Sequence, residues 1–197
     1  MLKTNSWIID YKVMTDSVGM QEIYLAPGDF YFGGADTRIR TILGSCISVV
    51  MWHSARKIGG MCHYMLPSRQ QVFDDIDIQP RGKIDSKYAD EAFSLFLMEM
   101  MRRKSNPAEY SVQLFGGGDM FPGQTKKEGA NDIAKRNIAA AHTLMTRHGF
   151  KISKEDTGGT GHRNIVFEIG TGDVRIRHVK ISEDPQTSVN SLTRRRD

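Results

Sequence analysis

Apolar residues recur along the chain with two different periods, and this pattern predicts a mixture of strands and helices. Short apolar or alternating runs, each bounded by glycine, proline or polar turn residues, predict strands at 23–25, 29–32, 37–43, 47–52, 58–66, 111–115, 150–156, 164–169 and 174–181. Apolar residues three and four positions apart predict helices at 87–104 and 131–148. We therefore expect an α/β fold of the mixed α+β kind, in which mixed, largely antiparallel β-sheets form a sandwich flanked by two amphipathic helices.

Each predicted helix has one apolar stripe. We expect the buried positions to be Ala89, Phe93, Phe96, Leu97 and Met100 in the first helix, and Ile133, Ile138, Ala141 and Met145 in the second. Asn137 of the second helix is interpreted as a solvated amide, with a hydrogen-bonded tie to the glycines at 116–118 as the alternative.

The segment TILGSCISVVMWHSARKIGGMCHYMLP, residues 41–67, is where the sequence points to chemistry. Its two apolar runs flank a polar turn and predict a β-hairpin. A turn centred on 54–55 would place Cys46 opposite His63, with Cβ atoms about 4.5–5.5 Å apart. Cys62 would then point to the other face of the hairpin.

A cysteine beside a histidine suits acyl transfer, because an imidazole accepts the proton of the thiol and stabilises the thiolate. Gly44 and Ser45 precede Cys46, and their loop can present backbone N–H groups to an oxyanion, since glycine allows close approach. A free cysteine also occurs often as a small buried hydrophobic residue. The spacing alone therefore leaves two interpretations open: a catalytic pair, or a structural thiol that lies near a histidine.

These residues resemble a known family. LGSC followed by a β run, with the histidine seventeen residues later in H-x-M-L-P, is similar to the chemoreceptor glutamine deamidases (CheD) of bacterial chemotaxis. The stretches FGGGDMF, IAKRN and TGGTGHRNIVFEIGTGDVRIR resemble that family's remaining blocks in the same order, so the resemblance covers about residues 22–181. It implies that Cys46 is the nucleophile and His63 its base.

The resemblance also implies a catalytic threonine that orients the histidine. In the family it lies six residues before the cysteine, in T-L-G-L-G-S-C, where this chain has Arg40; the threonine of this chain is Thr41, five residues before Cys46. On a regular strand an offset of one residue reverses the direction in which a side chain faces, unless a bulge or a shorter loop restores it. We expect Thr41 to orient the histidine, with Ser45 as the substitute.

The fold implied by the resemblance is that of the catalytic domain of cytotoxic necrotizing factor, also a cysteine-dependent glutamine deamidase. The implied activity is hydrolysis of glutamine side-chain amides of methyl-accepting chemoreceptors to glutamate, with no cofactor. The expected partners are the cytoplasmic helices of those receptors, with the CheC phosphatase as a further candidate. The alternatives are a cysteine protease or other amidase, a receptor methylesterase, and a non-catalytic adaptor that binds receptors or CheC.

Three further features are candidates for a role at the site. The glycines at 116–118 do not form a phosphate loop, because Gln124 stands where that motif requires lysine, and the resemblance makes Gly117 part of a loop that shapes the site. Arg163 is a candidate for positioning substrate or a carboxyl group, with a surface arginine as the alternative. The polar connection at 68–85 is predicted either to border the site and gate substrate, or to be a plain surface insertion.

Length and composition limit the organisation and the function class. A chain of 197 residues fits one domain, and we expect an N-terminal extension at 1–20, a single deamidase-like catalytic domain at 21–181 and a disordered polar tail at 182–197. The absence of a long apolar run or a signal-peptide layout predicts no membrane insertion and a cytoplasmic location. Two cysteines make no disulfide framework, and no metal-binding spacing is present. The net charge of +4 is scattered, which argues against nucleic-acid binding.

Overall fold

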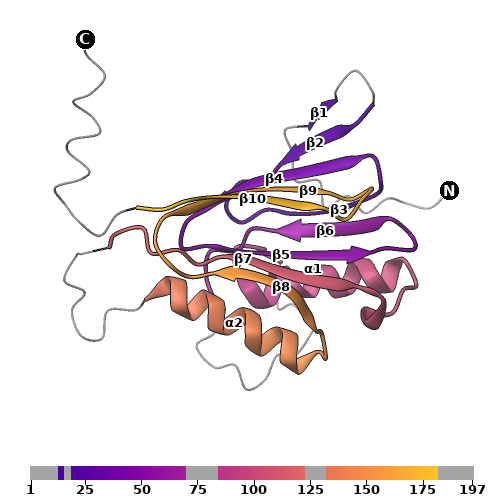
Figure 1. Cartoon of the computed structure of the whole chain (residues 1–197). Coiled ribbons are helices and arrows are strands. Elements are labelled where there is room, and N and C mark those ends of the chain that lie inside the picture. Colours follow the sequence, from indigo (N-terminus) through magenta and orange to yellow (C-terminus); the bar gives the residue numbers. More distant parts are fainter. Residues whose placement is uncertain (1–12, 16–18, 70–83, 123–131, 182–197) are drawn as a thin grey trace, which may run out of the picture.

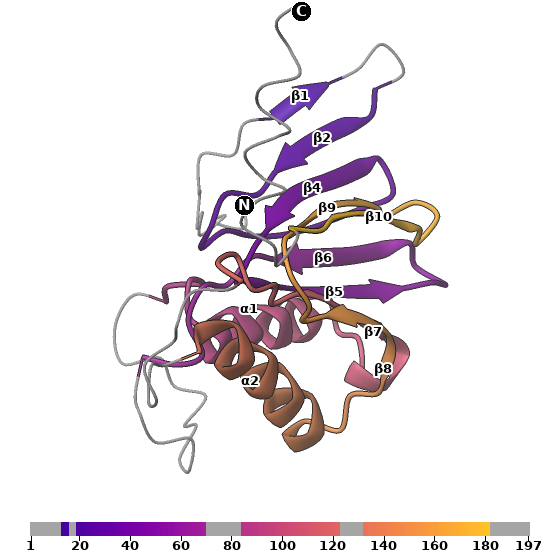
Figure 2. The ribbon, with the colours of Figure 1, turned by 60° about the vertical axis from the view of Figure 1, so that its left-hand side comes forward.

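The protein is built in three layers: two stacked β-sheets and a pair of helices on the outer face of one of them (Figure 1). The computed structural model describes residues 13–15, 19–69, 84–122 and 132–181. Sheet A has the strand order β1-β2-β4-β9-β10, and sheet B has the order β3-β6-β5-β7-β8. Both helices lie against sheet B, which is therefore the central layer (Figure 2).

Sheet A is mixed. Its strands are β1 (Val13–Thr15), β2 (Gln21–Tyr24), β4 (Thr37–Leu43), β9 (His162–Glu168) and β10 (Val174–Val179). The β2 and β4 strands run parallel, and the other neighbouring pairs are antiparallel. The hairpin predicted at the end of the domain is confirmed by β9 and β10.

Sheet B is also mixed. Its strands are β3 (Phe30–Gly33), β5 (Ile47–His53), β6 (Ile58–Cys62), β7 (Ser111–Gly116) and β8 (Ile152–Thr157), and a short 3-10 helix, η1 (Pro107–Glu109), precedes β7. Only β7 and β8 run parallel among the neighbouring pairs of this sheet. The predicted class, a mixed α/β fold with two helices and two largely antiparallel mixed sheets, is confirmed.

Each face of sheet B packs against a separate apolar core. One lies between the sheets and contains Ile39, Val50, Phe115 and Phe167; the other lies beneath the helices. A strand covered on both faces has no polar alternation, because neither face meets water. This explains why β5 is an almost continuous apolar run in which all residues except Trp52 are buried.

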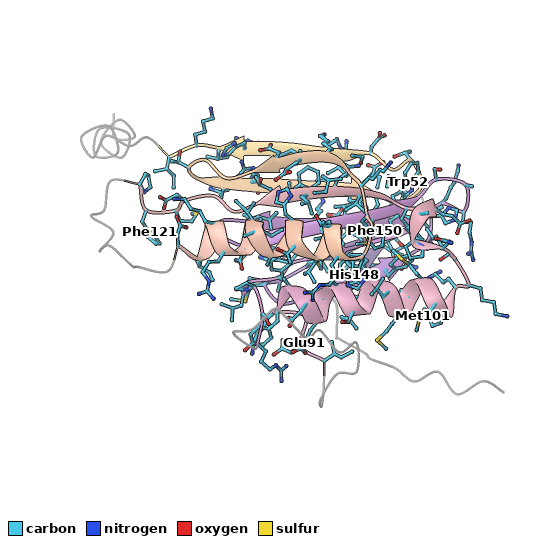
Figure 3. All side chains as sticks on the ribbon, turned by 90° about the horizontal axis from the view of Figure 1, so that it is seen from below. Trp52, Glu91, Met101, Phe121, His148 and Phe150 are labelled. Atoms are coloured by element: carbon cyan, nitrogen blue, oxygen red, sulfur yellow. The ribbon has the colours of Figure 1, made fainter. Side chains whose placement is uncertain are left out.

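The helices α1 (Ala89–Arg102) and α2 (Ile133–Arg147) form the third layer, as predicted. Figure 3 shows them side by side, with His148 and Phe150 between them near the end of α2. Phe93 of α1 packs against both of these rings, at centroid distances of 4.7 and 5.5 Å. The contact ties the end of α2 to the middle of α1.

The stripe predicted for α2 is partly wrong. Ile133 and Ile138 are only half-buried. The residues of α2 that are buried are Ala134, Asn137, Ala140, Ala141, Leu144 and Met145. The helix is therefore rotated about its axis relative to the expected orientation, and Asn137 is at the centre of the buried face. The interpretation of Asn137 as a solvated amide is wrong.

The hairpin of β5 and β6 is confirmed, but the predicted register is wrong by two residues. The pairs are Val50 with Met61 and His53 with Ile58, because the turn runs to Lys57, which adopts a left-handed backbone conformation with φ of 48°. Ile47 and Tyr64 exchange backbone hydrogen bonds, so His63 lies beside Ser48 and not beside Cys46. A shift of two residues preserves the face of a strand, so Cys46 and His63 still share one.

Several predictions concern residues outside the described ranges. They are the tail at 182–197, most of the connection at 68–85 and most of the extension at 1–20. The part of the extension that the structure describes includes β1, which pairs with β2 at the edge of sheet A. Neither described helix is long and apolar enough to cross a membrane.

Candidate active site

His63 follows β6 directly and is held by both its backbone and its ring. Its side chain is buried, with 2% of the residue exposed. Thr41 Oγ1 lies 2.7 Å from His63 Nδ1 and donates its own hydrogen to the carbonyl oxygen of Leu25 at 2.9 Å. A hydroxyl group has one hydrogen to donate, so Thr41 accepts the Nδ1–H hydrogen bond. The lone pair of the ring is therefore on Nε2, which has no hydrogen-bond partner among the described residues.

The strand geometry of β4 selects Thr41 over Arg40. Burial alternates along β4, with Thr37, Ile39, Thr41 and Leu43 buried. Arg40 points to the outer face of sheet A and pairs with Glu22 at 2.6 Å. The structure thus brings together Thr41 and His63, as expected, and Thr41 needs no bulge in the regular β4–β9 ladder to face inward.

The backbone of His63 is fixed by the turn that precedes β3. The N–H of Gly28 donates to the carbonyl of His63 at 2.7 Å, and the N–H of His63 donates to the carbonyl of Asp29 at 2.9 Å. The Asp29 carboxylate in turn accepts from the N–H of Ala26 at 2.8 Å, which closes the turn. These contacts were not predicted, because the turn and the histidine are more than thirty residues apart in the sequence.

Cys46 is half-buried and lies in the bend between β4 and β5. All three carbonyls of this bend accept a hydrogen bond. The carbonyl of Gly44 accepts from Gly118 N at 2.8 Å, and that of Cys46 accepts from Gly117 N at 2.8 Å. The carbonyl of Ser45 accepts from Asn137 Nδ2 at 3.2 Å. None of the three N–H groups of the bend donates to any described residue. Within the part of the chain that the structure describes, the bend therefore has hydrogen-bonded carbonyls and N–H groups without an acceptor beside its thiol.

Gly117 and Gly44 are glycines because the bend packs tightly against its neighbours. Gly117 has φ of +65°, and a Cβ atom there would lie 2.7 Å from the side chain of Ile138. A Cβ atom on Gly44 would lie 2.9 Å from the side chain of Met120. The N–H of Gly117 donates to the carbonyl of Cys46, so this N–H cannot bind a ligand. Gly117 therefore shapes the bend.

Arg163 is not a surface residue, and this alternative is wrong. It is 2% exposed, and its guanidinium group donates to the Asp156 carboxylate at 2.8 and 2.9 Å. It also donates to the carbonyls of Gly158 at 2.8 Å and Gly116 at 3.4 Å. Arg163 does bind a carboxyl group, but that of the protein itself, and so it supports the glycine loop from within the sandwich.

The electrostatics favour an uncharged thiol and imidazole in the resting protein. Burial raises the pKa of the Cys46 thiol. Burial also lowers the pKa of His63 to about 4, against the opposing effect of the Leu25 carbonyl. Cys62 is on the other face, as predicted, where burial raises its pKa to about 12. Cys46 is therefore the more accessible and more readily ionised of the two thiols.

Sequence reasoning assigned Asn137 to solvent or to a tie with the glycines at 116–118, but its side chain is buried and bonds to other residues. Its side-chain Nδ2 bonds not only to Ser45 but also to the carbonyl of Met65 at 2.8 Å. The available signal was helical spacing, because Asn137 lies three residues after Ala134 and four before Ala141, both buried. Within the described residues, no group of three or more His, Cys, Asp or Glu side chains gathers to hold a metal ion.

Comparison with known proteins identifies the family. The family model for CheD chemotactic sensory transduction matches residues 65–178. A protein of Pseudomonas savastanoi pv. phaseolicola, named probable chemoreceptor glutamine deamidase CheD, is 42% identical over 165 residues, which cover 84% of this chain and 89% of that protein. Similar proteins carrying this name come from Dechloromonas aromatica (40% identical, covering 79% and 86%) and from Leptospira interrogans (36% identical, covering 79% and 91%).

The comparisons reach the site as well as the scaffold. The family model begins two residues after His63, but an alignment over 84% of the chain necessarily includes the segment from Thr41 to His63. The match therefore extends over strands of both sheets, over both helices and over the bend that contains Cys46. On this evidence the chain belongs to the CheD family.

Proposed function

We propose that this protein hydrolyses glutamine side-chain amides of methyl-accepting chemoreceptors to glutamate and releases ammonia. The names of its relatives, probable chemoreceptor glutamine deamidases, support this substrate and reaction. The expected partners are the cytoplasmic helices of the receptors, and the CheC phosphatase is a candidate regulator. A cytoplasmic location and a fold like the catalytic domain of cytotoxic necrotizing factor complete the proposal.

The first half of the reaction forms a thioester. Cys46 Sγ attacks the amide carbon while its proton passes to His63 Nε2, and the carbonyl oxygen becomes an oxyanion. The N–H groups of the bend at 44–46, which have no acceptor among the described residues, are suited to stabilise this oxyanion. Collapse of the intermediate breaks the C–N bond, and the proton on Nε2 passes to the departing nitrogen, which leaves as ammonia.

The second half of the reaction restores the thiol. A water molecule attacks the thioester carbon and gives a proton to His63 Nε2. The C–S bond then breaks, and the sulfur of Cys46 recovers the proton from Nε2. The product carboxylic acid ionises to glutamate. Only side chains and backbone groups of the protein act in this scheme, so no cofactor is required.

The observation that carries the proposal is the pair of contacts of Thr41. The Thr41 hydroxyl donates its one hydrogen to the carbonyl of Leu25 and accepts a hydrogen bond from the Nδ1–H of His63. Nε2 is therefore the basic nitrogen of the ring. Because the pKa of His63 is lowered to about 4, this nitrogen stays unprotonated at neutral pH. A base that must accept a proton during attack requires this state.

Replacement of Cys46 tests the proposal. Wild type, Cys46→Ala and the matched control Cys62→Ala are incubated with a receptor cytoplasmic fragment, and ammonia and fragment mass are measured. We expect Cys46→Ala to lose all detectable activity and Cys62→Ala to keep it, because Cys62 lies on the other face of sheet B. Undiminished ammonia release by Cys46→Ala would contradict the mechanism.

The same measurement separates the alternative functions. Conversion of an amide to an acid adds about one dalton and leaves the chain intact, whereas a protease cuts it. A methylesterase acts on the methylated receptor and releases methanol, with no ammonia from glutamine. An adaptor binds the receptor fragment or CheC with no change of mass.

A further inference from the structure

Asn137 joins the two halves of the site from a third element. Its side-chain amide has two N–H groups on one nitrogen, and both are used: one on Ser45, the residue before the nucleophile, and one on Met65, two residues after His63. The side chain is 0% exposed. A planar amide holds its two N–H bonds at a fixed angle, so Asn137 sets the separation of the two carbonyls that it binds.

These contacts complete a closed ring of hydrogen bonds and chain segments that contains Cys46 and lies next to His63. Ile47 and Tyr64, the residues after the thiol and after the imidazole, exchange two backbone hydrogen bonds at 3.0 and 3.1 Å. The hydroxyl of Tyr64 donates to the backbone carbonyl of Asn137 at 2.6 Å. The ring therefore runs from Ser45 through Asn137 to Met65, back along the chain to Tyr64, across to Ile47 and through Cys46 to Ser45.

Asn137 is costly at this position for a residue with only a packing role. The neighbouring buried positions of α2 are apolar, as expected for a helix face against a core. Moreover, Asn137 Oδ1 is buried and has no hydrogen-bond partner among the described residues. An unpaired buried acceptor destabilises a fold, so the contacts that favour an asparagine here are the two that Nδ2 makes with the carbonyls of Ser45 and Met65. The first of these carbonyls belongs to the bend that contains Cys46.

We propose that Asn137 is a positioning residue, which holds the bend that contains Cys46 at the distance from the His63 strand that proton transfer requires. It acts through Ser45 and Met65 and does not touch the substrate. The inference deepens the proposed function and rests on it for the identity of the reaction. The sensitivity of proton transfer to small displacements explains why one amide matters: a shift of about 1 Å can reduce a rate roughly a hundred-fold.

The test compares Asn137→Leu, which has similar volume and no donor, with Leu144→Val on the same buried face of α2. Three quantities are measured: kcat and KM with a receptor fragment, the rate of Cys46 alkylation by iodoacetamide as a function of pH, and the midpoint of urea unfolding. We expect Asn137→Leu to reduce kcat roughly ten- to a hundred-fold with KM within about two-fold of wild type, and to slow alkylation at pH 7. We expect Leu144→Val to lower the urea midpoint and to leave kcat and alkylation unchanged.

Asn137→Ser extends the test if the leucine variant does not fold. A single hydroxyl cannot serve both carbonyls, so the same losses are expected. If every folded Asn137 variant keeps wild-type kcat and alkylation while the urea midpoint falls, Asn137 is only structural and the proposal is wrong. If the wild type releases no ammonia from any receptor fragment, the proposed function fails; the alkylation rates, which need no receptor, still decide the role of Asn137.

Discussion

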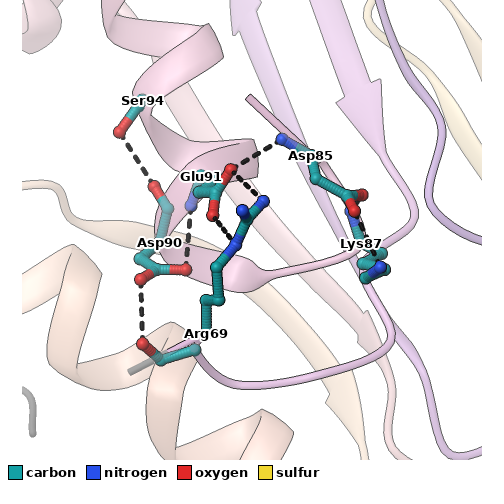
Figure 4. Close-up of polar contacts among 7 residues, drawn as sticks. Arg69, Asp85, Lys87, Asp90, Glu91 and Ser94 are labelled. Atoms are coloured by element: carbon teal, nitrogen blue, oxygen red, sulfur yellow. Dashed lines mark hydrogen bonds and ion pairs between the residues drawn. The ribbon is translucent and has the colours of Figure 1, made fainter. Parts of the chain in front are cut away.

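Two regions of this protein hold neighbouring segments together by polar contacts, and they do so by opposite means. Around the thiol, buried and mostly uncharged groups bond across the interior: Thr41 and His63, and Asn137 with Ser45 and Met65. At the start of α1, charged groups form a cluster on the surface, which we term the α1 clamp: Arg69, Asp85, Lys87, Asp90 and Glu91 (Figure 4). The first region restricts geometry, whereas the second mainly brings chain segments together.

The α1 clamp has many contacts but little burial. Arg69 makes two contacts with Glu91, at 2.8 and 3.1 Å, and the N–H of Asp85 donates to Glu91 at 2.6 Å. The side chains of Arg69, Lys87 and Asp85 are 45%, 42% and 37% exposed, however. Water and salt screen such pairs, so each contributes little to stability. Thr41 and His63 are at most 2% exposed. Loss of a hydrogen bond there destabilises the fold more than loss of a surface ion pair, because the buried partner is left unpaired.

Two arginines provide the sharpest test of this contrast. Arg163 and Arg69 both contact one carboxylate through two nitrogens, but Arg163 is 2% exposed and Arg69 is on the surface. We expect Arg163→Gln to lower the free energy of unfolding by about 3 kcal/mol, because it leaves the Gly158 carbonyl without its donor and the Asp156 carboxylate without its charged partner. Arg69→Gln should cost less than about 1 kcal/mol. Urea unfolding of both variants measures this, and equal losses would contradict the contrast.

His63 should make stability depend on pH in the acidic range. Its pKa is about 4 in the folded protein and about 6.5 when unfolded, so between these values the unfolded chain binds the extra proton. Stability contributed by neutral His63 is therefore fully present above pH 6.5 and is lost as the pH falls towards 4, by about 3 kcal/mol in total. His63→Gln cannot titrate and should lack this loss. Urea unfolding of both proteins at pH 7.0, 5.5 and 4.5 tests the prediction, and parallel curves would contradict it.

Thr41→Val separates orientation from packing, because valine has the shape of threonine but no hydroxyl group. Without the Thr41 oxygen as acceptor at Nδ1, His63 is less restricted to one tautomer, and we expect kcat to fall roughly ten- to a hundred-fold. Nitrogen NMR of His63 measures the tautomer directly. Ser68→Ala, which removes a 2.9 Å hydrogen bond to Asp90 at the α1 clamp, is the matched control and should leave kcat unchanged. A Thr41→Val protein with wild-type kcat and the wild-type tautomer would exclude an orienting role.

The repeating patterns were sufficient to predict most of the scaffold. The periods of 2 and 3.6 residues reflect which faces are buried, so the β5–β6 hairpin, β9 with β10 and both helices were predicted with small errors at their ends. The position of Thr41 follows from the same alternation, since Thr37, Ile39 and Leu43 are buried with it. These features can be predicted because each depends on a short stretch of neighbouring residues.

The features that were predicted wrongly depend on partners far away in the sequence or on the conformation of one turn residue. The hairpin register was set by the left-handed Lys57, and lysine carries no signal for that conformation. Arg163 and Asn137 are polar, and polar residues are usually exposed. Their burial became intelligible only with Asp156, Ser45 and Met65 in place. Buried polar residues of a site are therefore difficult to predict from sequence, because a polar side chain is expected on the surface.

The smallest effect is expected at the α1 clamp itself. Glu91→Gln removes the charge that binds Arg69 and keeps an oxygen that can accept from the N–H of Asp85. We expect the free energy of unfolding to fall by less than about 1 kcal/mol at low salt, and the difference from wild type to disappear near 1 M NaCl, where charges are screened beyond about 3 Å. Urea unfolding at the two salt concentrations measures both values. A loss that persists at high salt would mean that the Glu91 contacts act as short, desolvated hydrogen bonds, and the contrast between the two regions would then be one of location and not of physics.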